Sequence, residues 1–271
     1  MTSYLGFLFG LTAFLYLVST SAYVAHFYLR QGGRAATATG ILAFGCHTLT
    51  LGLLVFHLRH PPLYSGFEAL FSLAWVVMLN YLLFELLTGL RVAGTFLLPL
   101  ALLFLVYAGV LPRPWEAAGV PLASYWVLVH SLVALAGYGA LTLAFAAAVM
   151  YLLQERKLRQ KDFHLFYQRL PSLDTLDSLA YRFVLYGFPL LSLGIVIGSL
   201  WARQAWGLPF LREPKEFFSV LLWLVYAAYL GARVLLGWRG RRAAYLLVGG
   251  FGLMVFNFFV VNLFLSRRHV F

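Results

Sequence analysis

The chain has 271 residues, of which 62% are hydrophobic and only 11% are charged. Soluble domains carry about a quarter charged residues, so this composition excludes a water-soluble fold and predicts an integral membrane protein. The formal net charge of +11 resides mainly in short connections between apolar runs, where basic residues normally set membrane topology. We therefore expect the lipid bilayer as a partner and no nucleic acid.

Eight apolar segments follow one another along the chain, each of about the 20 residues that span a hydrocarbon core. They are Tyr4–Tyr28, Ala35–Phe56, Phe67–Leu87, Val92–Val110, Tyr125–Leu153, Phe183–Ala202, Phe217–Leu236 and Ala243–Leu265. Continuous apolarity predicts helices, because the strands of a membrane barrel would alternate at every second residue. We expect an all-α integral membrane protein with a bundle of about eight transmembrane helices, in which residues 1–271 form a single polytopic membrane domain.

The N-terminal residues and the single cysteine bear on processing of the chain and on its thiol chemistry. Met1–Gly6 has no basic stretch of the kind that begins a cleaved signal peptide, so the first apolar run is expected to remain. Cys46 lies within an apolar run, where a small buried residue is expected. A lone cysteine forms neither an intramolecular disulfide nor a CxxC motif for thiol exchange.

The basic residues predict the orientation of the chain. The connections after segments one, three, five and seven hold 13 of the 20 lysines and arginines: Arg30, Arg34, Arg91, Arg156, Lys157, Arg159, Lys161, Arg169, Arg182, Arg233, Arg239, Arg241 and Arg242. The opposite side holds seven: Arg59, Arg113, Arg203, Arg212, Lys215, Arg267 and Arg268. The positive-inside rule assigns the first group to the cytoplasm, so both termini are expected outside.

Two connections carry most of the polar character. The inner connection, residues 154–181, is basic, and its leucines at 172–179 recur every three or four residues, which predicts a short amphipathic helix on the inner surface. The outer connection, residues 201–218, combines rings with cations: Trp201, Trp206, Phe210, Arg212, Lys215 and Phe217. An aromatic belt at the membrane interface explains such rings, but rings beside cations also suit haem, a flat hydrophobic dianion.

Few acidic residues interrupt the apolar segments, and none forms the intramembrane pair that a proton relay or cation transporter usually needs. Glu85 lies near the inner end of the third segment, where its side chain is expected to snorkel to the surface. Glu68 begins that segment on the outer side and is expected to pair with an outer cation such as Arg59, Arg203 or Arg212. The sequence has no phosphate loop, HExxH or nucleophile motif, so we do not expect an enzyme.

Four of the seven histidines fall on the outer side under this topology: His57, His60, His130 and His269. A histidine at the interface is more often solvated than a ligand, although imidazole is a common ligand of haem iron. His47 lies near the middle of the second segment, where an imidazole is costly unless it has a partner.

Part of the outer connection matches a tryptophan-rich loop with the pattern W-G-x-x-W-x-W-D-P-K-E. The matching residues are Trp206, Gly207, Pro214, Lys215 and Glu216, while Phe210, Arg212 and Glu213 replace Trp, Trp and Asp. The stretches 173–177, 187–191, 194–198, 201–202, 224–230 and 237–245 are similar as well. With this degenerate "WWD" loop, the chain resembles over nearly its whole length the cytochrome c assembly superfamily of membrane haem-handling proteins, which includes CcsA, CcmC and HemX. It is most similar to CcsA and HemX.

The resemblance implies a site for haem b at the outer face. His130 and His269 would ligate the iron, and two axial imidazoles suit holding haem rather than activating oxygen. The other residues implied at the site are His60, Trp201, Trp206, Phe210, Arg212, Lys215 and Phe217. The implied function is haem handling in cytochrome c assembly or haem homeostasis, with an assembly protein as partner, in the plasma or inner membrane.

The chain departs from CcsA at Gly231, where CcsA-type proteins carry a membrane histidine. Two alternatives stay open beside haem handling. A HemX-type accessory protein would influence a haem-biosynthesis enzyme through its inner basic loop. A small-solute transporter would use the same scaffold without haem.

Overall fold

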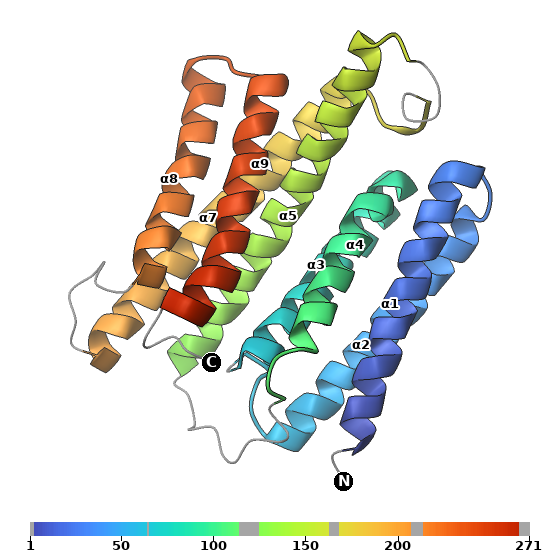
Figure 1. Cartoon of the computed structure of the whole chain (residues 1–271). Coiled ribbons are helices and arrows are strands. Elements are labelled where there is room, and N and C mark those ends of the chain that lie inside the picture. Colours follow the sequence, from blue (N-terminus) through green and yellow to red (C-terminus); the bar gives the residue numbers. More distant parts are fainter. Residues whose placement is uncertain (1–2, 64, 114–124, 163–167, 207–213, 266–271) are drawn as a thin grey trace. The chain divides into compact units, whose positions relative to one another are not determined.

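The computed structural model describes residues 3–63, 65–113, 125–162, 168–206 and 214–265, and these residues are helical apart from short connections (Figure 1). Within them, eight helices are long and apolar enough to cross a membrane. The predicted all-helical membrane fold with eight spans is therefore confirmed, and the chain is a multi-pass membrane protein. It divides into two compact units, residues 1–123 and 124–271. The single domain and the orientation of the termini stay predictions.

The first unit contains four long helices and one short turn of 3-10 helix. These are α1 (Ser3–Leu29), α2 (Gly33–Leu58), α3 (Gly66–Thr88), η1 (Arg91–Ala93) and α4 (Gly94–Ala108). α1 packs against α2 and α4, and α3 packs against α4 and α2. Local capping sets the bounds of α3. The hydroxyl of Ser65 accepts the backbone N–H of Glu68 at 3.1 Å, and Gly89, at a φ of 71°, donates its N–H to the carbonyl of Glu85 at 2.7 Å.

The second unit is built around a long pair of helices that Figure 1 shows side by side. Its helices are α5 (Tyr125–Arg159), α7 (Leu173–Trp206), α8 (Pro214–Leu235) and α9 (Arg241–Phe256), which continues as the π-helix η3 (Asn257–Leu265). α5 and α7 approach closely because small residues line their contact. A Cβ on Gly187 would lie 2.8 Å from Leu141, and one on Gly137 would lie 3.1 Å from the backbone nitrogen of Leu191.

The structure differs from the expectation of a separate amphipathic helix in the inner connection. α5 continues to Arg159 and α7 begins at Leu173, so the leucines at 172–179 belong to the first turns of α7. Leu176 and Ala180 are buried within the unit. The apolar face that predicted a helix on the membrane surface is therefore covered by neighbouring helices instead.

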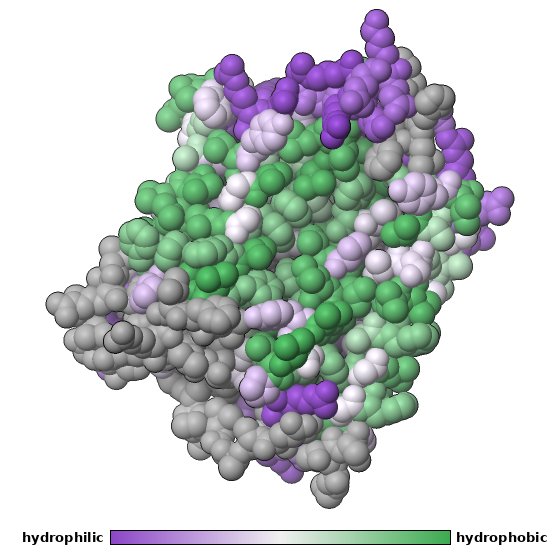
Figure 2. All heavy atoms as spheres, viewed as in Figure 1, coloured by the Kyte–Doolittle hydropathy of each residue, from purple (hydrophilic) through white to green (hydrophobic). Residues whose placement is uncertain are grey.

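Large hydrophobic side chains remain exposed along the spans, among them Phe7, Leu86, Tyr186 and Leu200. Figure 2 shows such hydrophobic side chains over the sides of the helices, with hydrophilic ones gathered toward helix ends. This surface is what the hydrocarbon core of a bilayer solvates.

Candidate functional site

His130 lies in the second turn of α5, and its ring packs against α7. Its Nδ1 lies 2.8 Å from the carbonyl oxygen of Gly194. Because a carbonyl oxygen only accepts, Nδ1 carries the proton and Nε2 keeps its lone pair. Nε2 has no hydrogen-bond partner among the residues that the structure describes. The ring is thus oriented as in metal-ligating histidines, whose second nitrogen donates to a carbonyl or carboxylate.

Two glycines of α7 form the seat of this ring. Gly194 supplies the carbonyl, and Gly198 supplies the space, since a Cβ there would lie 2.6 Å from Cε1 of His130. They stand four residues apart, so they share one face of the helix. Trp201 follows at the next turn of that face and is partly buried. The structure therefore places Trp201, one of the predicted site residues, beside the helix surface that holds His130.

The first turn of α8 adds a cation and aromatic rings. Lys215, one of the predicted site residues, lies in this turn within electrostatic range of the imidazole of His130. The side chain of Phe217 is 52% exposed, and its ring meets that of Phe218 edge-on with centroids 5.4 Å apart. Phe218 in turn contacts Phe256 at 5.2 Å. The start of α8 therefore offers an exposed ring and an ammonium group in the same unit as His130.

The remaining predicted site residues are not brought to His130 by the described part of the chain. His269, Phe210, Arg212 and the side chain of Trp206 lie outside the described residues, so their place in the site stays a prediction. His60 belongs to the first unit. A site that joins His60 to His130 also stays a prediction.

His60 has contacts of its own within the first unit. Its Nδ1 lies 2.9 Å from the carbonyl oxygen of Pro61 and 3.9 Å from a carboxylate oxygen of Glu68, which is fully buried. The structure thus places a histidine beside this carboxylate, and the expected pairing of Glu68 with an outer cation such as Arg59, Arg203 or Arg212 stays a prediction. The contact lies near the start of α3, where the Pro61 carbonyl holds the His60 ring beside the Glu68 carboxylate.

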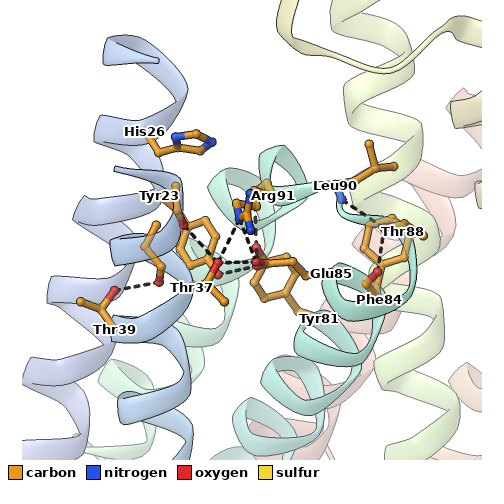
Figure 3. A network of polar contacts seen from close by, with 12 residues as sticks. Tyr23, His26, Thr37, Thr39, Tyr81, Phe84, Glu85, Thr88, Leu90 and Arg91 are labelled. Carbon is orange, nitrogen blue, oxygen red and sulfur yellow. Dashed lines mark hydrogen bonds and ion pairs between the residues drawn. The ribbon is translucent and has the colours of Figure 1, made fainter. Parts of the chain in front are cut away.

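A buried carboxylate, Glu85, joins four elements of the first unit (Figure 3). Its Oε2 accepts the hydroxyls of Tyr23 and Tyr81, each at 2.5 Å. Its Oε1 lies 2.5 Å from the hydroxyl of Thr37 and 3.3 Å from Nε of Arg91. The expected snorkelling is therefore wrong, because donors from α1, α2, α3 and η1 satisfy the carboxylate where it is buried.

The sequence held only one local signal for this cluster. Tyr81 precedes Glu85 by four residues on the same helix face. Tyr23 and Thr37 are separated from Glu85 by 62 and 48 residues, so only tertiary packing brings them together. We assign the cluster to holding α1, α2, α3 and η1 in place.

His47 is fully buried within the first unit. Its Nδ1 lies 2.8 Å from the hydroxyl of Tyr16, and its ring lies on that of Phe71 with centroids 4.1 Å apart. The partner that an intramembrane imidazole needs is therefore present. Among the described residues, no group of three or more His, Cys, Asp or Glu side chains is arranged to hold a metal ion.

Comparisons with known proteins match most of this chain. A family model described as Cytochrome C assembly protein matches residues 35–269. The chain is 34% identical to the cytochrome c biogenesis protein CcsA of Guillardia theta over 82% of this chain and 80% of that protein. It is 32% identical to CcsA of Synechococcus elongatus over 86% of each chain. With CcsA of a Synechocystis species it shares 29% identity over 95% of each chain.

Proposed function

Because the chain belongs to the cytochrome c assembly protein family, we propose that it binds and handles haem at the outer face of its membrane during cytochrome c biogenesis. Its similarity to CcsA proteins supports the role in cytochrome c biogenesis. Handling means holding haem without transforming it, so the proposal assigns no catalytic residues. The plasma or inner membrane is the proposed location.

The observation that carries the proposal is the state of the His130 ring. Its Nδ1–H donates to the Gly194 carbonyl, so Nε2 is the one ring nitrogen with a lone pair that can coordinate a metal. One imidazole suits haem iron, because the macrocycle already supplies four nitrogen ligands. The seat therefore fits an axial haem ligand that is oriented before the haem arrives.

The other groups follow from the chemistry of haem. His269 is the proposed second axial ligand, and the rings of Trp201, Trp206, Phe210 and Phe217 are the proposed shelf for the macrocycle. Cationic side chains suit the propionates. Lys215 and Arg212 are the proposed cations, and the charge of Lys215 already acts at His130. His60 is a reserve ligand in this proposal.

The haem is proposed to be haem b, held without a covalent link. Covalent attachment of c-type haem uses a C-x-x-C-H motif, and this chain has one cysteine. We further propose at most one haem per chain. At Gly231, where CcsA-type proteins carry a membrane histidine, a Cβ would meet nothing within 4 Å. Packing in the described part of the chain thus leaves room for a side chain there, yet the sequence supplies no ligand.

The test is the absorbance spectrum of the protein purified from haem-replete cells. The wild type is expected to show a Soret band with low-spin bis-imidazole features, and His130→Ala and His269→Ala are each expected to abolish or greatly weaken them. Added imidazole should partly restore the spectrum, since it occupies the vacated position. His164→Ala, from the predicted inner side, is the matched control and should leave the spectrum unchanged.

Three results would contradict the proposal. A wild-type spectrum in the His130→Ala/His269→Ala double variant would refute the ligand assignment. A stoichiometry of two haems per chain would refute the single site. A wild-type protein without a Soret band would favour the HemX-type accessory role or a small-solute transporter.

A further inference from the structure

A hollow of about 520 Å³ opens at one end of the second unit, between the end of α5 and the connection from α8 to α9. It is lined by four arginines together with a tryptophan, a leucine and a glycine: Arg159, Leu236, Gly237, Trp238, Arg239, Arg241 and Arg242. Figure 2 shows hydrophilic side chains gathered at this end of the unit, above the hydrophobic sides of the helices. The proposed haem site uses none of these residues.

The backbone around the hollow is held in one conformation by a carboxylate of α7. Asp177 accepts two hydrogen bonds from the guanidinium of Arg233, at 2.9 and 2.6 Å, and a third from the backbone N–H of Gly240 at 2.9 Å. The N–H of Trp238 donates to the carbonyl of Ala232 at 3.0 Å. A bidentate ion pair with an added backbone bond orders both ends of the connection. The arginines therefore project from a fixed frame.

The charges that face the hollow are predominantly positive. Glu155 contacts the lining, with one oxygen 2.8 Å from Arg159 and the other 3.7 Å from Arg241, and Asp177 binds the backbone at Gly240 between Arg239 and Arg241. Arg242 lies over the ring of Trp238 at 5.8 Å, and Arg239 is exposed. With the Asp177–Arg233 pair included, five guanidinium groups against two carboxylates leave a net positive charge, which attracts an anion.

The first turn of α9 adds backbone donors to these side chains. The helix begins at Arg241, and its N-cap, Gly240, provides no side-chain hydrogen bond. The first N–H groups of a helix lack partners within it, and the helix dipole makes that end favourable for anions. Guanidinium groups and helix N–H groups together suit the oxygens of a phosphate.

Apolar residues directly beside the arginines indicate the source of that phosphate. Val234, Leu235 and Leu236 have exposed side chains, at 67%, 82% and 67% of their surfaces. α8 ends at Leu235 and α9 begins at Arg241, and both helices are long and apolar enough to span the membrane. The hollow therefore lies where two spans end, at the depth of lipid headgroups.

We propose that this hollow binds the phosphate headgroup of an anionic phospholipid, with its acyl chains against Leu235 and Leu236. Basic pockets at the ends of membrane helices bind acidic headgroups through the same chemistry. The distribution of basic residues predicts that the lipid comes from the cytoplasmic leaflet. Loop arginines that only set topology need neither a fixed frame nor neighbouring apolar residues.

Native mass spectrometry of delipidated protein in detergent tests the site, with phosphatidylglycerol as the probe and phosphatidylcholine as the neutral lipid. The wild type is expected to bind phosphatidylglycerol in preference to phosphatidylcholine. Arg239→Gln/Arg242→Gln should weaken phosphatidylglycerol binding about 30-fold, since each basic residue near a membrane surface contributes about fivefold. Arg182→Gln removes an exposed arginine of α7 that does not line the hollow, and it should bind as the wild type does.

Circular dichroism of the double variant should show the helicity of the wild type, so that weaker lipid binding is not caused by unfolding. Wild-type affinity for phosphatidylglycerol in a folded double variant would overturn the proposal. An equal loss in Arg182→Gln would do the same, because it would show a general charge effect. Displacement of the lipid by millimolar inorganic phosphate would assign the hollow to a soluble phosphate and overturn the lipid source.

Discussion

Two histidines whose rings lie between packed helices differ in how far neighbouring residues bury the ring. His47 and His130 each engage a neighbour through Nδ1, at 2.8 Å from the Tyr16 hydroxyl and from the Gly194 carbonyl respectively. The ring of His47 is fully buried, whereas that of His130 is partly exposed. Both imidazoles are oriented by their neighbours, but only the one in the second unit is reachable. Accessibility, rather than residue type, separates a structural histidine from a candidate ligand.

The surroundings of the two histidines also differ between the first and the second unit. In the first unit, Glu85 is buried among the hydroxyls of Tyr23, Tyr81 and Thr37 and the Arg91 side chain. The polar groups there satisfy one another's hydrogen bonds, as expected of residues that hold helices together. In the second unit, Gly198 leaves room on α7 that the ring of His130 fills, and this ring is partly exposed. We therefore expect changes in the first unit to alter stability and changes that displace the His130 ring to alter haem binding.

The largest effect is expected from Glu85→Ala in the first unit. The hydroxyls of Tyr23 and Tyr81 would stay buried without their acceptor, at a cost of about 1–3 kcal/mol each, whereas the partly exposed Arg91 can turn to solvent. Unfolding in mixed micelles with increasing sodium dodecyl sulfate measures the loss. Glu85→Gln keeps an acceptor and should cost less. Unchanged stability in Glu85→Ala would show that the cluster does not hold the frame.

Gly198→Ala should separate haem binding from stability. The new Cβ would lie 2.6 Å from Cε1 of His130, so the ring must leave its seat. Changes to groups that orient a metal ligand cost about 10- to 100-fold in affinity. Haem titration followed at the Soret band measures the change.

Gly194→Ala is the matched control for that variant. Its Cβ would lie 3.5 Å from Ala134, an ordinary van der Waals contact, and it keeps the carbonyl that orients His130. It should bind haem about as the wild type does. Equal affinities for Gly198→Ala and the wild type would mean that the seat does not position the ligand.

His47→Phe should leave haem binding unchanged and lower stability modestly. Phenylalanine keeps a ring against Phe71 but leaves the Tyr16 hydroxyl without its partner, at a cost of about 1–2 kcal/mol. The Soret absorbance per folded protein is the first measurement, and unfolding in mixed micelles is the second. A lost Soret band in this variant would place a haem ligand in the first unit, against the structural role assigned to His47.

Tyr16→Phe should have the smallest effect. It removes one hydroxyl from the bond with His47, and hydrogen bonds between membrane helices contribute about 0.6 kcal/mol on average. The same unfolding assay should detect a shift smaller than that of His47→Phe. A larger shift would show that the hydroxyl does more than pair with the imidazole.

Much of the fold was predictable because a membrane span is a local property. About 20 consecutive apolar residues suffice to identify a helix in a bilayer, and all eight predicted spans appear. The same local view was wrong for residues 172–179, where periodic leucines indicated a surface helix. A helix of that period is stable wherever its apolar face is covered, and neighbouring helices cover it here.

The candidate site was predictable only in part. His130 was identified by its predicted side and by the family resemblance, and the same reasoning paired it with Lys215 and Trp201. The seat was missed, because nothing local relates Gly194 and Gly198 to a histidine more than 60 residues earlier. Glu85 was misassigned for the same reason, since most of its donors come from other helices.

The sequence by itself determined that the chain enters the membrane, where its spans lie and which family it resembles. These follow from hydropathy and from motifs, which are read along the chain. The tertiary structure alone decided that His47 is buried against Phe71, whereas the partly exposed His130 is held by the carbonyl of Gly194. The physical reason is that burial and hydrogen bonding depend on which helices pack together, and packing joins residues that are distant in sequence.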